Sequence, residues 1–317
     1  MNESHVALGI DAGGSSASWL VMDSSGRELA GGRTGAVTGH VFSEAGSDVL
    51  SSEGEASSVR LREIAAGALQ AARPAAVVLG ATGLEAGSRS ANYFEQLLAD
   101  ALGLDRARVS VSNDMDIAYR TTFEPGQGVL VYGGTGSVAW HIARDGSALR
   151  VGGHGYLIDD AGGGYWIGRA ALARVLRWHD EQGAPAAGRP LADEVYAQLG
   201  AREWDDVREE VYVKGRSRVA ALAQAVARAA ARGDAAALAI QREAGEELAR
   251  LANVALARLG MILPVAVAGG VSRQGPVLLD ALRARLPEGT PFQTVTDEPV
   301  LGAAKLALEL ARRPVPG

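Results

Sequence analysis

Two glycine-rich turns contain the residue types that can bind a phosphate chain. One is DAGGSS at residues 11–16 and the other is GGTGS at residues 133–137, and each follows a short apolar run. Glycine lets backbone N–H groups approach phosphate oxygens closely, and the hydroxyl groups add further donors. One such turn alone could be an ordinary hairpin, so the match between the two is the stronger evidence. The predicted phosphate-binding residues are Gly13, Gly14, Ser15, Ser16, Gly133, Gly134, Thr135 and Gly136.

Two acidic residues stand where they could serve phosphate chemistry. Asp11 opens the first turn, and its carboxylate suits a Mg²⁺ ion held through water, because it cannot bind phosphate directly. Asp114 follows a strand predicted at Arg108–Val111, and active sites of α/β sheets lie at the carboxyl ends of strands. Asp114 could accept the proton of an attacking hydroxyl or could cap the helix predicted at Met115–Thr121, and its spacing leaves both interpretations open. Asp116 fits the helix N-terminus better.

The glycine-rich stretch Gly152–Gly164 carries two adjacent acids, Asp159 and Asp160, and one histidine, His154. Adjacent side chains in an extended segment point in opposite directions, so we expect at most one of the acids to face a ligand. The alternative is that both are solvated loop acids. No second histidine stands at metal-ligand spacing from His154, so we interpret this residue as a hydrogen-bonding loop residue.

Composition excludes several classes of protein. The 317-residue chain has no cysteine, which rules out disulfides, iron–sulfur clusters and cysteine nucleophiles. Its net charge of −6 argues against nucleic-acid and membrane partners. The N-terminal apolar run is too short for a secretory signal, so we expect a cytoplasmic protein. A Walker-type loop is absent, and the residues after Gly136 alternate like a strand, which disfavours a dinucleotide-binding fingerprint.

The sequence predicts two α/β halves that begin alike. Residues 8–29 and 130–149 each predict a strand, a glycine turn and further strands, and Gly26 in one corresponds to Gly146 in the other. Later strands alternate with helices in both halves. Further predicted elements are a long loop at 35–54, a helix at 59–72, helices over 190–259 broken at Gly200, Gly215 and Gly233, and a final helix at 299–312.

Several segments, taken in order, resemble the N-acetylglucosamine kinase-like branch of the actin, sugar-kinase and heat-shock-chaperone ATPase superfamily. This branch is the BadF/BadG/BcrA/BcrD ATPase family. The segments span residues 8–310 and are GIDAGGSSAS, SNDMDIA, VYGGTGSVA, GGHGYLIDDAGGGYWIG, AGGVS and DEPVLGAAKLAL. The resemblance implies an α/β protein with two lobes of ribonuclease H-like (actin-like ATPase) fold, whose mixed sheets are flanked by helices and which close around ATP and a sugar. It implies lobes at residues 1–118 and 119–317, with the last helix able to pack back on the first.

The resemblance also implies roles for individual residues. Asp11 would hold Mg²⁺ through water, Asp114 would be the catalytic base and Asp160 would help to hold the sugar. Further residues implied at the sugar are Asn113, Thr135, Gly153 and His154, and those implied at the adenosine are Gly269, Gly270 and Ser272. The chain departs from the family's common pattern on the sugar side, with His154 in place of tryptophan and Ala161 in place of glutamate.

We therefore predict an ATP- and Mg²⁺-dependent kinase. Its expected substrate is a small-molecule sugar, N-acetylglucosamine or glucosamine or a related hexose, phosphorylated on the 6-hydroxyl. The resemblance implies a homodimer. Two alternatives stay open, namely a cluster-free ATPase switch and a sugar-binding regulator with a degenerate kinase site.

Overall fold

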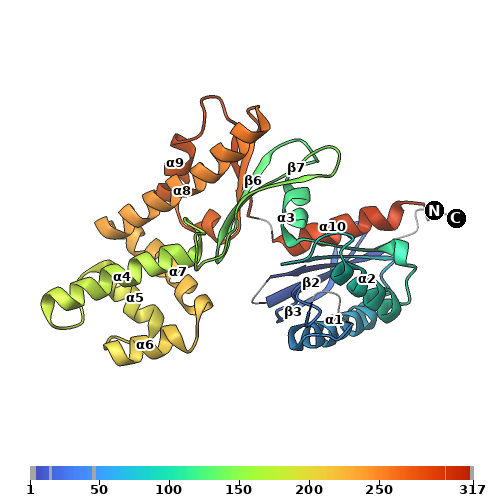
Figure 1. Ribbon diagram of the computed structural model, residues 1–317, viewed down its shortest axis with the longest axis horizontal. Helices are drawn as coiled ribbons and strands as arrows, with labels where there is room; N and C mark the ends of the chain where they lie inside the picture. Colours follow the sequence, from blue (N-terminus) through green and yellow to red (C-terminus); the bar gives the residue numbers. More distant parts are fainter. Residues whose placement is uncertain (1–4, 14–15, 45–47, 297, 315–317) are drawn as a thin grey trace. The chain divides into compact units, whose positions relative to one another are not determined.

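The computed structural model describes the chain in four stretches (Figure 1), which are residues 5–13, 16–44, 48–296 and 298–314. The chain forms two compact units. The first is Met1–Thr121 together with Asp297–Gly317, and the second is Thr122–Thr296. Among the described residues, no helix combines the length and the apolar character needed to cross a membrane.

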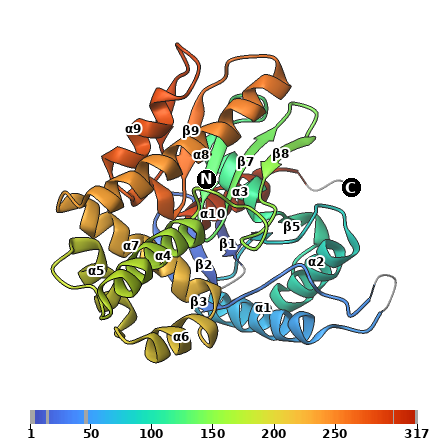
Figure 2. The same cartoon turned by 60° about the vertical axis from the view of Figure 1, so that its left-hand side comes forward.

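The first unit is built on a mixed five-stranded sheet in the order β3-β2-β1-β4-β5. Strands β1 to β3 form an antiparallel meander, and β4 and β5 run parallel to β1. Helices α1 and α2 cover one face of the sheet, and α3 and α10 cover the other (Figures 1 and 2). The elements are β1 (Val6–Ala12), β2 (Ser16–Asp23), β3 (Glu28–Gly35), α1 (Ser52–Ala71), β4 (Ala76–Ala81), α2 (Arg89–Leu102), η1 (Arg106–Arg108), β5 (Val109–Ser112), α3 (Asp114–Thr122) and α10 (Pro299–Arg312).

The C-terminal helix α10 belongs to the first unit, although the residues just before it belong to the second. It lies along β1, where Gly9 allows a close approach because a Cβ at Gly9 would lie 2.2 Å from the Ala304 nitrogen. Whereas we expected the lobes to divide between residues 118 and 119, the compact units divide near the end of α3.

The second unit repeats the topology of the first. Its sheet has the order β10-β9-β6-β7-β8, in which β6 to β8 are antiparallel and β9 and β10 run parallel to β6. One core joins this sheet to the surrounding helices. The elements are β6 (Val129–Gly133), β7 (Ser137–Ile142), β8 (Ala148–Gly152), α4 (Gly164–Gln182), α5 (Pro190–Leu199), α6 (Trp204–Tyr212), α7 (Arg216–Ala231), α8 (Ala235–Leu259), β9 (Val265–Ala268), η2 (Gly270–Arg273), α9 (Pro276–Ala284) and β10 (Phe292–Thr294).

The predicted α/β fold class with two similar halves is confirmed. The equivalent hairpins after β2 and β7 both turn at a glycine with φ of +86°, Gly26 in one and Gly146 in the other. Such a positive φ is the conformation that favours glycine over other residues. The predicted breaks at Gly200, Gly215 and Gly233 also fall between helices, and these three glycines have positive φ.

The long loop predicted at residues 35–54 is only partly correct. Helix α1 begins at Ser52, earlier than the predicted start at residue 59. Ser51 caps it by accepting a hydrogen bond of 2.9 Å from the Gly54 nitrogen. The first turn contains serine, glycine and glutamate and lacks the apolar periodicity on which the prediction relied, so the cap and not the hydrophobic pattern sets the start of this helix.

Candidate functional site

Asp11 and Asp114 come together in the first unit at the carboxyl ends of its parallel strands. Asp11 is near the end of β1, and Asp114 begins α3 directly after β5. Gly80 on β4 lies beside Asp11 and makes room for α3, because a Cβ there would be 3.2 Å from the Asp114 Cα and closer still to Ile117. The fold therefore places two carboxylates where the sequence predicted a metal ligand and a base.

The electrostatics of these two acids differ from those of exposed carboxylates. Burial raises the pKa of Asp11 to about 7, and the negative charges of Asp114 and Glu298 add to the rise, while Arg33 opposes it. Burial also raises the pKa of Asp114, and hydrogen bonds from Thr82 and from the Met115 nitrogen oppose that rise. Clustered acids of this kind favour the binding of positive charge.

A bound Mg²⁺ fits this donor set. Carboxylate oxygen is a ligand that Mg²⁺ prefers, and the excess negative charge at Asp11 would be relieved by a cation. No group of three or more candidate metal ligands exists in the part of the chain that the structure describes. A Mg²⁺ ion at Asp11 would therefore take most of its ligands from water and phosphate, and its binding there stays a prediction.

Thr82 contacts a candidate site residue, although the sequence analysis did not single it out. Its hydroxyl donates a hydrogen bond of 2.6 Å to Asp114 Oδ2. The residue follows β4, and its backbone nitrogen donates to the Ala12 carbonyl at 3.0 Å. A hydroxyl residue just past the end of a buried strand was the available indication, but only the pairing of β4 between β1 and β5 places it against Asp114.

Asn113 has a structural role in this fold. Its Oδ1 accepts a hydrogen bond of 2.9 Å from the Met115 nitrogen, and its Nδ2 donates to the Leu84 carbonyl at 3.0 Å. Asn113 therefore caps α3, a role that the sequence left open for Asp114. The sugar contact expected of Asn113 stays a prediction, and these two bonds do not favour it.

The first glycine-rich turn is described in part. The Gly13 nitrogen donates a hydrogen bond of 2.9 Å to the Ser16 carbonyl, which joins the end of β1 to the start of β2. Gly14 and Ser15, both predicted to bind phosphate, lie outside the described residues. Ser16 begins β2 directly after them.

Three glycine-rich segments that are far apart in the sequence meet in the second unit. The turn at residues 133–136 is contacted by residues 160–164 and by residues 269–271. A Cβ at Gly163 would lie 2.6 Å from the Gly136 backbone, and a Cβ at Gly269 would lie 2.5 Å from the Gly133 carbonyl oxygen. The approach requires glycine, and it joins the predicted phosphate, sugar and adenosine segments into one cluster.

Asp160 points at the second glycine-rich turn. A Cβ added at Gly136 would lie 2.0 Å from Asp160 Oδ2. Asp160 is buried, and Oδ1 accepts a hydrogen bond of 3.1 Å from the Gly155 nitrogen. Burial raises the pKa of Asp160, and the neighbouring Asp159 carboxylate adds to the rise. Among the described residues, Asp160 is the one non-glycine residue with positive φ, at 57°, a conformation often retained at functional sites.

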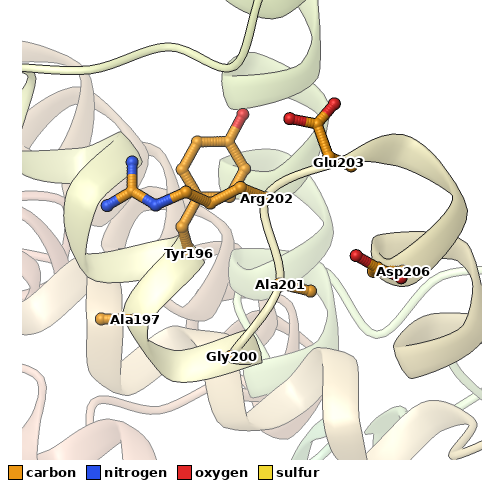
Figure 3. Close-up of a pocket in the computed structure, with 7 residues that line it drawn as sticks. All are labelled: Tyr196, Ala197, Gly200, Ala201, Arg202, Glu203 and Asp206. Carbon is orange, nitrogen blue, oxygen red and sulfur yellow. The ribbon is translucent and has the colours of Figure 1, made fainter.

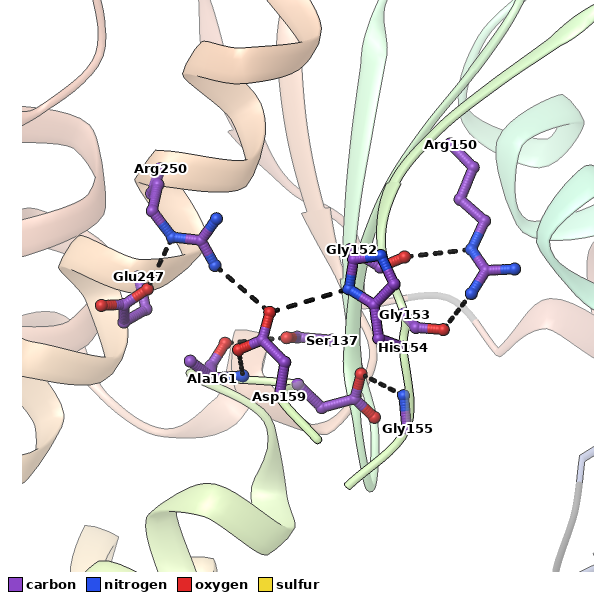
Figure 4. A network of polar contacts seen from close by, with 11 residues as sticks. Ser137, Arg150, Gly152, Gly153, His154, Gly155, Asp159, Ala161, Glu247 and Arg250 are labelled. Atoms are coloured by element: carbon purple, nitrogen blue, oxygen red, sulfur yellow. Dashed lines mark hydrogen bonds and ion pairs between the residues drawn. The ribbon is translucent and has the colours of Figure 1, made fainter. Parts of the chain in front are cut away.

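Asp159 belongs to a separate polar network (Figure 4). One of its oxygens lies 3.8 Å from His154 Nδ1 and 3.6 Å from Arg250, and Arg250 also donates to Glu247 at 2.8 Å. The two adjacent acids thus have different hydrogen-bond and ion-pair partners, and the expectation that at most one of them faces a ligand stays a prediction. His154 Nδ1 lies at ion-pair distance from Asp159, beyond hydrogen-bond distance, and the Gly153 carbonyl accepts a hydrogen bond from Arg150.

At the predicted adenosine segment, Ser272 is used within its own loop. Its hydroxyl donates to the Gly269 carbonyl at 2.8 Å, and its nitrogen donates to the same oxygen at 3.2 Å. Ser272 therefore holds Gly269 in place, and the contacts of Gly269, Gly270 and Ser272 with a nucleotide stay predictions.

A hollow of about 410 Å³ lies elsewhere in the second unit (Figure 3). It is formed where α5 leads into α6, and no predicted site residue lines it. The lining residues are Tyr196, Ala197, Gly200, Ala201, Arg202, Glu203 and Asp206. The candidate residues are therefore the two carboxylates in the first unit and the glycine-rich segments in the second, each described within its own unit, and this hollow is not among them.

Comparison with known proteins relates this chain to a family of ATPases and to sugar kinases. The sequence profile of the BadF/BadG/BcrA/BcrD ATPase family matches residues 8–307. The N-acetyl-D-glucosamine kinase of Dictyostelium discoideum is 26% identical over an alignment of 324 positions, which covers 96% of this chain and 98% of that kinase. The N-acetylmuramic acid/N-acetylglucosamine kinase of Clostridium acetobutylicum is 29% identical over 181 residues, which cover 56% of this chain and 58% of that kinase.

A solved structure from Chromobacterium violaceum, provisionally assigned as an N-acetylglucosamine kinase, has the same fold. It superposes with a TM-score of 0.65 at 28% identity and covers 97% of this chain and 99% of its own. The superposition confirms the predicted fold class over nearly the whole chain.

Proposed function

Because the chain belongs to the BadF/BadG/BcrA/BcrD ATPase family, we propose that it is an ATP-dependent kinase that phosphorylates a sugar hydroxyl. The matched relatives are named for kinase activity on N-acetylglucosamine and N-acetylmuramic acid. We take N-acetylglucosamine, phosphorylated on its 6-hydroxyl, as the proposed substrate, with glucosamine or a related hexose next. The relatives favour this function over an ATPase switch or a regulator.

The observation that carries the proposal is the position of the Asp114 carboxylate. Asp114 is the first residue of α3, at the carboxyl end of a parallel strand and near Asp11. The Thr82 hydroxyl donates a hydrogen bond of 2.6 Å to the Asp114 Oδ2 atom. A carboxylate held in this way can accept a proton from a hydroxyl group, provided that it is ionised. Asp114 remains the proposed catalytic base.

The proposed reaction is a displacement at the γ-phosphorus of ATP. The sugar oxygen forms a bond to phosphorus while its proton passes to Asp114, and the bond from phosphorus to the bridging oxygen of ADP breaks. The glycine-rich turns would contribute backbone N–H groups to the phosphates, and Asp160 would orient the sugar. When bound through water at Asp11, Mg²⁺ supplies positive charge to the phosphate oxygens.

The variant Asp114→Asn tests this proposal. The amide keeps the shape of the side chain but cannot take up the proton, so we expect sugar-dependent ADP formation to fall by about 10²-fold or more. Binding of ATP should be retained. Coupled ADP release, measured with a panel of sugars, and calorimetric titration with ATP check the two expectations. Asp116→Asn removes the same charge two residues away and should keep most of the activity.

Full turnover by Asp114→Asn would remove this residue from the mechanism. ADP formation that needs no sugar would instead favour the ATPase switch, and sugar binding without turnover in the unaltered chain would favour the regulator. These outcomes can be told apart in the same assays.

The proposal also includes a cytoplasmic homodimer that binds neither nucleic acid nor membrane. The family resemblance supports the homodimer, and the net charge of −6 supports the absence of polyanionic partners. Sedimentation analysis of the purified chain tests the oligomeric state.

A further inference from the structure

Arg33, Ser18 and Asp11 form a row across three neighbouring strands. Asp11 of β1 pairs with Ser18 of β2, and Ser18 pairs with Arg33 of β3. Directly paired residues in a sheet share a face, and the face of this row is the one on which α10 packs against Leu20 and Met22. Arg33 Nε donates a hydrogen bond of 3.2 Å to Ser18 Oγ. The guanidinium is thereby held at the end of the sheet that carries the first glycine-rich turn.

The charge around this row is strongly unbalanced. Asp11 feels the negative charges of Asp114 and Glu298, and Arg33 is the cation that acts on it. Arg33 is exposed, and its hydrogen bond to Ser18 uses Nε, so within the described residues its terminal nitrogens have no acidic partner. Arg27, on the same hairpin, is instead paired with Asp23 at 3.3 Å.

The exposed Arg33 guanidinium, whose terminal nitrogens have no acidic partner among the described residues, lies beside the predicted phosphate-binding turn and is suited to bind phosphate. Guanidinium groups bind phosphate oxygens through two parallel hydrogen bonds, and they keep their charge at all physiological pH values. Both lysines of the chain, Lys214 and Lys305, lie outside the glycine-rich turns. Phosphoryl transfer requires that the charge on the transferred group be neutralised.

We propose that Arg33 binds the phosphate chain of the nucleoside triphosphate at the end of the sheet where Asp11 and Ser18 lie, and that Ser18 orients its guanidinium. The identity of the ligand as a nucleotide rests on the proposed function, whereas the recognition of a phosphate chain rests on the row itself. Free tripolyphosphate has the same phosphate chain without the nucleoside, so its binding tests the recognition of phosphate separately from the recognition of a nucleotide.

Calorimetric titration of the full chain, without sugar and in the presence of EDTA, tests the proposal. We expect Arg33→Gln to bind ATP and tripolyphosphate about tenfold more weakly, which corresponds to the loss of one charged hydrogen-bonding group. Its affinity for adenosine should be unchanged, because adenosine has no phosphate. Arg33→Lys should recover part of the loss. Arg27→Gln removes an arginine from the other end of the hairpin and serves as the matched control.

Unchanged affinity of Arg33→Gln for both phosphate ligands would overturn the inference. An equal loss of affinity for adenosine, or a loss matched by Arg27→Gln, would also overturn it, since a general change in fold or charge would then explain the result. If the unaltered chain binds tripolyphosphate through Arg33 but does not bind ATP, the recognition of a phosphate chain by Arg33 stands, while the nucleotide as its ligand and the proposed function fail. If the unaltered chain binds neither ligand, both fail.

Discussion

At the scale of single residues, the candidate site of the first unit depends on two neighbouring acids that are proposed to have different roles. Asp11 and Asp114 are close enough for the charge of one to raise the pKa of the other, yet one is proposed to serve a cation and the other a proton. Thr82 distinguishes them, because its hydroxyl bonds only to Asp114 in the described contacts. That hydrogen bond favours the ionised form of Asp114 and opposes the effect of burial.

Replacement of Thr82 by valine should make the proposed kinase more sensitive to acid. Without the hydroxyl donor, the pKa of Asp114 rises further, so a larger fraction of the base is protonated as the pH falls. We expect kcat/KM for the sugar to be clearly lower than in the unaltered chain at pH 6 and similar to it at pH 9. A pH profile of the initial rate measures the shift.

Thr82→Ser keeps the hydroxyl and is the matched control for this pH effect. It should restore the acidic limb of the unaltered chain. An acidic limb that stays in place in the valine variant would mean that Thr82 does not tune Asp114.

At the scale of elements, the sequence predicted most helices and strands but not how their loops meet. The helix Pro299–Arg312 was predicted with the bounds that the structure gives, because an apolar run and a flanking proline define it. The start of α1 was missed because a polar cap determines it. The contact of Asp160 with Gly136 could not be predicted, since it depends on the packing of two separate loops.

The sequence analysis overlooked some residues because their places depend on contacts between separate elements. Thr82 and Arg33 carry no motif of their own, and each acquires its place through strand pairing, Thr82 beside β1 and β5 and Arg33 opposite Ser18. The family resemblance implied Asn113 at the sugar, and its role as the cap of α3 was not predicted; its contact with a sugar stays a prediction. Register and capping are settled by the folded sheet and not by the local sequence.

The fit of Asp160 against Gly136 predicts a thermodynamic coupling between them. Gly136→Ala should lower the free energy of unfolding by about 1–3 kcal/mol, as overpacking does, because the new Cβ would lie 2.0 Å from Asp160 Oδ2. Asp160→Gly removes that carboxylate and also suits the positive φ at this position. In the Asp160→Gly background, the cost of Gly136→Ala should therefore shrink. Denaturant unfolding of the two single variants and the double variant measures the coupling, and additive costs would contradict it.

At the scale of the whole molecule, the first unit is assembled from both ends of the chain. Residues 1–121 supply the sheet, and α10 returns from the C-terminus to cover the face that carries Asp11. The packing of α10 on β1 depends on Gly9, as the packing of α8 on α9 in the second unit depends on Gly245, where a Cβ would lie 2.2 Å from the Leu278 carbonyl oxygen. A substitution at Gly9 therefore tests the packing of the first unit, and one at Gly245 tests the packing of the second.

This arrangement predicts that the two ends of the chain lose stability together. Gly9→Ala forces α10 away from β1, so we expect faster amide hydrogen exchange in α10 and in β1, β2 and β4 at once, while α4, α7 and α8 keep their protection. Gly245→Ala is the matched variant and should do the reverse, exposing α8 and α9 and sparing α10. Hydrogen exchange followed by mass spectrometry of peptides from both units measures the two patterns. If Gly9→Ala loosened both units equally, the discontinuous unit would not be an independent folding unit, because a strain placed within it would have spread through the rest of the chain.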